Sequence, residues 1–295
     1  WADIDYFFAQ VSVEDGLVDF KPTCGNILSG VASAAIEMGL YPASKGETSL
    51  RIRAVNTGAE ILAKVQTPNG LISYAGEAVI DGVPGSAAPV ELNFMKVAGS
   101  STGTYLPTGN VTDKIDGVNV TCMDVAMPMV IARAEGFGLT GYETRDELDA
   151  NTAFFERMEA IRIKSGAAMG MGDVRKSVTP KFGLLAPARQ GGSVATRYFM
   201  PWKTNPTMAV TGSQCLASCV LTPGTVADGL VKRPAHSPAK ITLEHPMGLM
   251  DVLVDYQLNG DEFEHKSAGL IRTCRKIAQG QIFIPSEVWD GRTRR

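Results

Sequence analysis

The sequence predicts an α+β protein built around an extensive antiparallel sheet. Short segments in which apolar and polar residues alternate recur along the chain, and this period of two is typical of half-buried strands. Asn-Gly and Pro-Gly pairs follow several of these segments, as tight turns require. Few segments have helical character. Many strands, short turns and few helices together favour an antiparallel sheet over repeated parallel units.

The first part of the chain is predicted to place one buried helix among strands. Residues 27–38 are rich in Ala, Leu, Ile and Val and contain no proline, so we expect a helix that Gly39 ends. Pro68-Asn69-Gly70 predicts a hairpin turn into residues 71–80, because Asn-Gly tolerates positive φ angles. The segments expected as strands are YFFAQVSV (6–13), GLVDF (16–20), TSLRIRAVNTG (48–58), EILAKVQT (60–67) and VELNFMKV (90–97).

The second part is predicted to combine further strands with two helices. Residues 144–166 are predicted to form one amphipathic helix, and Thr144 with Glu147 three residues later predicts a capping box at its start. Residues 213–221 predict a short apolar helix that Pro223-Gly224 ends. The segments expected as strands are VNVTCMDVAMPMVIARA (118–134, as two strands), TPKFGLLAPA (179–188), ATRYFMPW (195–202), MDVLVDYQL (250–258) with DEFEHKSAGLIRTCRKI (261–277) after an Asn-Gly turn, and QIFIP (281–285).

Composition excludes several classes of partner. The formal net charge of −3 provides no electrostatic footprint for nucleic acid or for an anionic membrane. No apolar run approaches the roughly 18 residues that span a bilayer. The 5 cysteines lack metal-ligand spacing, which indicates free thiols in a reducing compartment, and hence a cytoplasmic protein without a metal site. The expected partner is therefore a small molecule, with no nucleic acid and no membrane.

A weak internal repeat suggests two similar domains that face each other. An aromatic strand and an irregular connection precede Cys24-Gly25-Asn26 and the first apolar helix. A second aromatic strand, RYFMPW, and a second irregular connection precede Thr211-Gly212-Ser213 and another small apolar helix. The two triplets would then hold equivalent positions. The repeat is short, and chance similarity is an open alternative.

Both helix starts have the character of carboxylate sites. The first backbone N–H groups of a helix lack partners, and the helix dipole adds partial positive charge at the same place. This field favours a thiolate at Cys24, so the thiol could exchange a proton with a carbon acid beside a carboxylate. The alternative is that Cys24 is a small buried core residue. His245, in the segment EHPMG, is alternatively a plain turn residue.

Four long stretches carry a resemblance to a known family. They are DYFFAQVSVEDGLVDFKPTCGNILSGVASAAIEMGL, IDGVPGSAAPVELNFMKVAGSSTGTYLPTGN, IDGVNVTCMDVAMPMV and GLIRTCRKIAQGQIFIP, in this order over nearly the whole chain. They resemble the PrpF family, which includes 2-methylaconitate cis-trans isomerase and 4-oxalomesaconate tautomerase. The resemblance implies a diaminopimelate epimerase-like α+β fold. Its two similar domains, residues 1–110 and 111–295, would each have a β-barrel-like sheet around a central helix.

The resemblance also implies a chemistry that needs no cofactor and no metal. Such isomerases shift a proton along an allylic system in an unsaturated di- or tricarboxylate, for example methylaconitate, aconitate or oxalomesaconate. Cys24 matches the family's catalytic cysteine, and a lysine is implied as the second proton carrier. Met247 stands where the family's EHPSG turn has serine. The residues expected to bind substrate are Gly25, Asn26, Thr211, Gly212, Ser213, His245 and Gly248.

One departure from the family leaves two further functions open. The amino-terminal segment that supplies the lysine is not found before Trp1, so we expect a first domain that is incomplete at its N-terminus. A non-catalytic polycarboxylate-binding fragment is therefore one alternative. An amino-acid racemase or epimerase of the same superfamily is the other, and it would need a second acid or base opposite Cys24. Lys181 is interpreted as structural, and a homodimer is expected.

Overall fold

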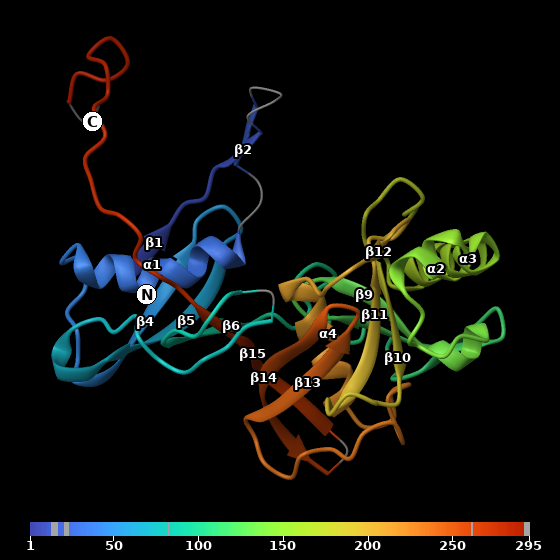
Figure 1. Ribbon diagram of the computed structural model, residues 1–295. Helices are drawn as coiled ribbons and strands as arrows, with labels where there is room; N and C mark the ends of the chain where they lie inside the picture. The colour runs from blue at the N-terminus through green and yellow to red at the C-terminus, as the bar shows by residue number, and fades with distance from the viewer. Residues whose placement is uncertain (13–16, 21–23, 82, 261, 292–295) are drawn as a thin grey trace.

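The computed structural model describes residues 1–12, 17–20, 24–81, 83–260 and 262–291 (Figure 1). Its helices are α1 (Gly25–Glu37), α2 (Arg145–Ala150), α3 (Thr152–Ala168) and α4 (Val210–Leu221), with 3-10 turns η1 (Pro68–Gly70) and η2 (Ala134–Phe137). Its strands are β1 (Ile4–Tyr6), β2 (Gln10–Ser12), β3 (Leu17–Asp19), β4 (Gly46–Ala54), β5 (Ala59–Thr67), β6 (Pro89–Met95), β7 (Asp113–Ile115), β8 (Val118–Asp124), β9 (Pro128–Arg133), β10 (Lys181–Ala186), β11 (Val194–Phe199), β12 (Thr204–Asn205), β13 (Ala239–His245), β14 (Gly248–Asn259) and β15 (Glu262–Thr273).

One sheet runs through two lobes. Its strand order is β1-β4-β5-β6-β15-β14-β13-β11-β10-β9-β8-β7, with β12 on β11. The first lobe holds α1 and the strands from β1 to β6, and the second holds α2 to α4 and the strands from β7 to β14 (Figure 1). β15 joins the two lobes, because it pairs with β14 on one side and with β6 on the other. The predicted α+β class with extensive antiparallel pairing is confirmed.

The first lobe folds because two long strands and one helix share an apolar face. In β4 and β5, buried residues alternate with more exposed ones, which is the signature of a sheet with one face in the core. Leu28, Ala32 and Ala35 of α1 are buried against that face. Gly39 follows the helix at φ +72°, so it ends α1 in the left-handed conformation as the sequence predicts.

In the second lobe, helices cover both faces of the sheet. α4 lies on one face of the sheet, and all residues from Gly212 to Leu221 are buried, so the helix is a core element on every side. α3 covers the other face, where Phe154, Met158 and Ile161 form a separate core with Phe182 and its neighbours. Figure 1 shows α2 and α3 on the outer side of this lobe, away from the first lobe.

Four of the expected elements differ from the structure. The strand expected over residues 6–13 is divided: β1 ends at Tyr6 and pairs with β4, whereas β2 begins at Gln10 and pairs with β3, and residue 13 lies outside the described residues. The helix expected over residues 144–166 is two helices, because the side chain of Asn151 accepts a hydrogen bond from the Phe154 N–H and starts a new helix there. The capping box of Thr144 and Glu147 is confirmed. The predicted hairpin into residues 71–80 is wrong. Asn69 does adopt a positive φ of 61°, as the turn requires, but the strand that follows β5 in the chain and pairs with it is β6.

The segment QIFIP is not a strand in the structure. Residues 281–285 have no regular pairing, and Ile282 and Phe283 are 92% and 89% exposed. The chain after β15 instead runs past α1, where Lys276 pairs with Glu37 at 2.7 Å (Figure 1). C-terminal residues therefore contact the first lobe, and the predicted boundary between residues 110 and 111 stays a prediction.

Candidate active site

The start of α1 presents uncapped backbone groups and a thiol. Cys24 precedes the first helical residue with φ −123° and ψ 111°, and its own side chain forms no capping hydrogen bond. The first turn carries no acidic residue, so no carboxylate of the helix itself neutralises this end. Tyr6 of β1 is buried, and its hydroxyl donates to the Cys24 carbonyl at 3.2 Å, which fixes the helix start to the sheet. Cys24 itself is half-buried.

The start of α4 is likewise uncapped but is packed more tightly. Ala209 precedes the helix without a capping hydrogen bond, and again no acidic residue lies in the first turn. Thr211 is half-buried, and its hydroxyl lies 3.2 Å from the sulfur of Met127. A Cβ atom on Gly212 would lie 2.6 Å from the ring of Tyr198, so only glycine fits against this buried tyrosine.

The structure brings the two helix starts together. A Cβ atom on Gly25 would lie 3.4 Å from Cγ2 of Val210, which is ordinary van der Waals contact between the first residues of α1 and α4. These residues are 185 positions apart by their numbers, and in Figure 1 the N-terminal end of α1 points toward the second lobe. Two positive helix ends therefore meet at the junction of the lobes, where an anion can be bound.

Two details of the predicted equivalence are corrected. Cys24 stands one residue before its helix, whereas Thr211 is the second residue inside α4, so the matching triplets are out of step by two positions. Ser213 is fully buried: its hydroxyl donates to the Val210 carbonyl at 2.8 Å and its N–H to Ala209. Neither group of Ser213 is available to a ligand in this arrangement. Asn26, by contrast, is exposed at the start of α1.

The turn between β13 and β14 carries the other predicted residues. His245 ends β13 and Gly248 begins β14, paired with each other across Pro246 and Met247. Gly248 has φ +140°, and a Cβ atom there would lie 2.2 Å from a carboxylate oxygen of Asp81. The same oxygen accepts the Leu249 N–H at 2.7 Å. Asp81 belongs to the first lobe, so this carboxylate ties the turn of the second lobe to the first.

His245 is held as a neutral imidazole. Its ring is buried, and Nδ1 accepts the Met247 N–H at 3.2 Å, which leaves Nε2 to carry the proton. Burial lowers the pKa of His245, and the charge of Arg197 lowers it further, while the carboxylate of Asp81 opposes this shift. A neutral imidazole can donate or accept a hydrogen bond, but it adds no positive charge for a carboxylate.

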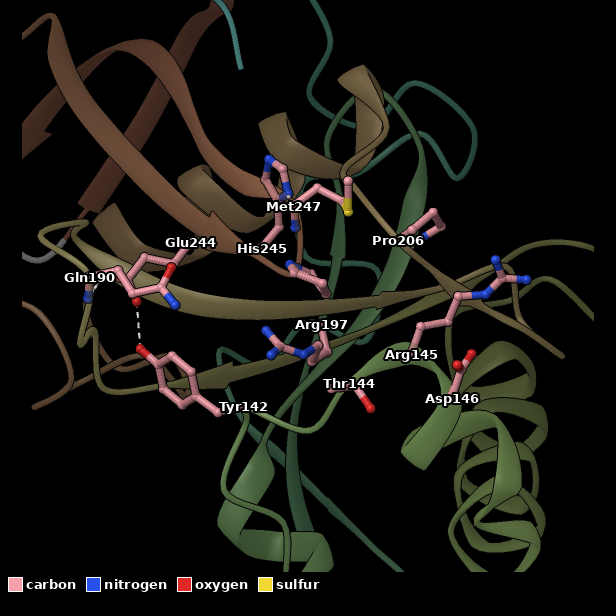
Figure 2. Close-up of a pocket in the computed structure, with 11 residues that line it drawn as sticks. Tyr142, Thr144, Arg145, Asp146, Gln190, Arg197, Pro206, Glu244, His245 and Met247 are labelled. Atoms are coloured by element: carbon pink, nitrogen blue, oxygen red, sulfur yellow. Dashed lines mark hydrogen bonds between the residues drawn. The ribbon is translucent and has the colours of Figure 1, made fainter. Parts of the chain in front are cut away.

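The predicted site residues fall into two places. Gly25, Asn26 and Thr211 lie at or beside the contact of the two helix starts. His245 instead lines a cavity of about 390 Å³ beside the β13–β14 turn, to which neither helix start contributes (Figure 2). Asp81 and Arg197 were missed by the sequence reasoning. Asp81 lies within IDGVPGSAAP, a stretch that carried the resemblance but had no role assigned to it.

The remaining cysteines separate into two groups. Cys122, Cys215 and Cys219 are fully buried, and burial raises the pKa of Cys122 and Cys219 to about 12 and that of Cys215 well above its ordinary value, as expected for inert core thiols. Cys274 is half-buried, with its sulfur 3.6 Å from the hydroxyl of Ser33. In the described part of the chain, no three His, Cys, Asp or Glu side chains gather as metal ligands.

Comparison with known proteins decides the family. The PrpF protein family matches residues 1–285. The (4E)-oxalomesaconate Delta-isomerase of Novosphingobium is 43% identical over 282 residues, which cover 96% of this chain and 78% of that protein. The 4-oxalomesaconate tautomerase of Pseudomonas putida is 42% identical over 293 residues, with 98% and 79% covered. The chain belongs to the PrpF family.

A solved structure supports the same assignment for this PrpF chain. The crystal structure of a methylitaconate-delta-isomerase superposes with a TM-score of 0.85 at 30% identity, covering 95% of this chain and 77% of that one. The fold is therefore the diaminopimelate epimerase-like α+β fold that the resemblance implied, and the PrpF chain is an isomerase. The incomplete first domain expected from the sequence stays a prediction.

Proposed function

We propose that this PrpF isomerase moves a proton along an allylic system in an unsaturated polycarboxylate of the aconitate, methylaconitate or oxalomesaconate type. The observation that carries the proposal is the contact of two uncapped helix starts, one of which bears a half-buried thiol. Relatives whose names include oxalomesaconate and methylitaconate support the substrate class, because these acids share an unsaturated carbon chain with several carboxylates.

The helix starts bind the carboxylates in this proposal. The side chains of Cys24 and Ala209 do not cap the first backbone N–H groups, and the two helix dipoles add positive potential without a charged side chain. A carboxylate held there withdraws electron density from the adjacent carbon and makes its proton more acidic. The same donors stabilise the negative charge that spreads onto the carboxylate when that proton leaves.

Cys24 carries one of the two proton transfers. Removal of a proton from one carbon leaves an allylic carbanion, and addition of a proton at the third carbon moves the double bond by one position. A thiol beside a helix start suits this step, because a positioned general acid or base contributes about 10²–10⁴ in rate. The turn with His245 and Gly248 is fixed to the first lobe through Asp81 and borders the second lobe's cavity.

An absorbance assay tests the substrate class. Aconitate, methylaconitate and oxalomesaconate each change ultraviolet absorption when the double bond moves, so each acid is supplied to the purified protein in turn. The proposal expects turnover of at least one acid, without added metal or cofactor. Inversion at a single carbon of an amino acid, with no movement of a double bond, would contradict it and favour a racemase. The cytoplasmic location and the homodimer expected from the sequence stay predictions.

A further inference from the structure

The cavity beside the β13–β14 turn is a separate place in the second lobe. Its volume is about 390 Å³, and its walls come from the segment before α2, from β11 and from the turn itself (Figure 2). None of its lining residues belongs to α1 or α4. The proposed isomerase chemistry at the helix starts leaves this cavity without a role.

A buried arginine lies on the wall of this cavity without an anionic partner. Arg197 of β11 is 5% exposed. Its Nε donates to the Glu143 carbonyl and its Nη1 to the Thr196 carbonyl, both at 2.8 Å, and both acceptors are neutral. Within the described part of the chain, Nη2 has no hydrogen-bond acceptor and the guanidinium has no ion pair. The guanidinium carbon lies 5.6 Å from the centre of the Tyr142 ring, a cation–π contact, but no carboxylate pairs with this buried charge.

The acids nearest to Arg197 are already engaged elsewhere. The carboxylate of Glu244 accepts hydrogen bonds from the Tyr142 hydroxyl and from the backbone N–H groups of residues 189, 190 and 192. The carboxylate of Glu143 accepts from Thr140 and from the Gly141 N–H. These bonds hold the pKa of both carboxyls below their usual range against the opposing effect of burial. Both acids contribute long-range attraction to Arg197, but neither is free to pair with it.

We propose that this cavity binds a small carboxylic acid, whose carboxylate pairs with the free side of the Arg197 guanidinium. The planar guanidinium suits a carboxylate oxygen, and such charge-assisted hydrogen bonds are about twice as strong as neutral ones. Tyr142, Pro206 and Met247 provide apolar wall for the carbon body of the acid (Figure 2). This site would be additional to the carboxylate positions at the two helix starts.

Two methionines allow the two sites to be followed at once. Met247 lines the cavity and is 66% exposed, whereas Met127 contacts Thr211 at the start of α4. The protein is labelled with ¹³C at its methionine methyl groups, and Met247→Leu and Met127→Leu assign the two signals. Succinate is titrated as the probe at constant ionic strength, because it is saturated and cannot undergo the allylic shift. We expect a saturable shift of the Met247 signal.

Variants then test the assignment to Arg197. Arg197→Gln should raise the Kd read at Met247 at least about tenfold, which is the effect of losing one charged pair worth about 1.4 kcal/mol. Asp146 lines the rim of the cavity and is exposed, so Asp146→Asn removes a repelling charge and should lower the Kd about twofold. An unchanged Met127 signal shows that each variant is folded. Cys24→Ala should leave the Met247 titration unchanged whatever its effect on turnover.

Three outcomes would overturn the proposal. In the first, succinate moves the Met127 signal alone, so that the acid binds only at the helix starts. In the second, Arg197→Gln is folded and titrates at Met247 as the wild type does. The third outcome applies if Arg197→Gln does not fold, in which case the test depends on Asp146→Asn. The proposal is then overturned if Asp146→Asn binds succinate no more tightly than the wild type does. The experiment measures binding at Met247 and not turnover. Its result is therefore independent of the proposed isomerase function, and either proposal can be contradicted while the other is supported.

Discussion

The two helix starts that meet at the lobe junction have the same backbone and different side chains. Both α1 and α4 begin after a residue whose side chain forms no capping hydrogen bond, and neither has an acid in its first turn. At α1 the neighbouring side chain is the half-buried thiol of Cys24, whereas α4 offers Thr211 and then residues that are completely buried. The comparison suggests that both starts can hold a carboxylate but that only α1 can move a proton.

Removal of the Cys24 thiol is the largest effect that this comparison predicts. Cys24→Ala should lower kcat by about 10²–10⁴, the range that one general acid or base contributes, and should leave the far-ultraviolet circular dichroism unchanged. Cys274→Ala is the matched control, because Cys274 is also half-buried but lies at the end of β15, where it contacts Ser33 of α1. Equal turnover in the two variants would remove Cys24 from the mechanism.

The second prediction concerns pH and the packing of α4. Burial lowers the pKa of His265 to about 4, and its Nε2 lies 3.1 Å from the hydroxyl of Ser218 in α4. In the unfolded chain His265 takes up a proton near pH 6.5, whereas in the folded chain it does so only near pH 4. Stability is therefore lost as the pH falls from about 6.5 to about 4. The loss should reach about 3 kcal/mol at most, measured by urea unfolding.

Two histidine variants check that assignment. His265→Gln should reduce the slope of unfolding free energy against pH between 6.5 and 4, because glutamine does not titrate, and should leave the contribution of His245, whose pKa burial also lowers. His236→Gln should leave the dependence as it is in the wild type, since His236 is exposed. If both variants lose stability toward low pH with the same slope as the wild type, another group causes the effect.

Alanine substitutions of the glycines at the two helix starts should have different effects, one mainly on stability and the other mainly on substrate binding. A Cβ at position 212 would overlap the Tyr198 ring at 2.6 Å, so Gly212→Ala should destabilise the fold by about 1–3 kcal/mol. A Cβ at position 25 would only touch Val210 at 3.4 Å, so Gly25→Ala should change stability by less than about 0.5 kcal/mol. It should instead raise KM, because the methyl group enters the site. If Gly212→Ala and Gly25→Ala destabilised the fold equally, the predicted difference in packing between the two helix starts would be contradicted.

The smallest effect is expected for the hydrogen bond between Asp81 of the first lobe and the Leu249 N–H of the second lobe. Asp81→Ala removes the acceptor of the Leu249 N–H, which should raise KM severalfold and reduce the unfolding free energy by about 1 kcal/mol or less. Asp81→Asn keeps an oxygen acceptor and should stay close to the wild type in both measurements. A loss of activity in the asparagine variant that equals the loss in the alanine variant would point to the charge of Asp81 rather than to its hydrogen bond.

Local patterns predicted the elements whose cause is local. The capping box at Thr144 and the end of α1 at Gly39 depend on neighbouring residues alone, and both are confirmed. The break at Asn151 was missed because an asparagine inside an amphipathic pattern gives no sign of whether its side chain caps a new helix. The QIFIP segment alternates like a strand, but a strand also needs a partner, which sequence patterning does not supply.

Contacts between distant segments account for the rest of the site. The sequence predicted that two helix starts would face each other, and Gly25 does lie beside Val210. Arg197 was counted only as part of an aromatic strand, because nothing local distinguishes an arginine that is buried from one that reaches solvent. Ser213 was assigned to the ligand from its place in a triplet, yet its hydroxyl donates within its own helix.

Protection of thiols by substrate tests the central claim most directly. The protein is alkylated with iodoacetamide with and without the polycarboxylate that it turns over, and mass spectrometry reads Cys24 and Cys274 in the same sample. We expect the acid to slow modification of Cys24 about tenfold or more and to leave Cys274 unaffected. Modification of Cys24 at one rate with and without saturating acid would show that the substrate does not bind where the two helices meet.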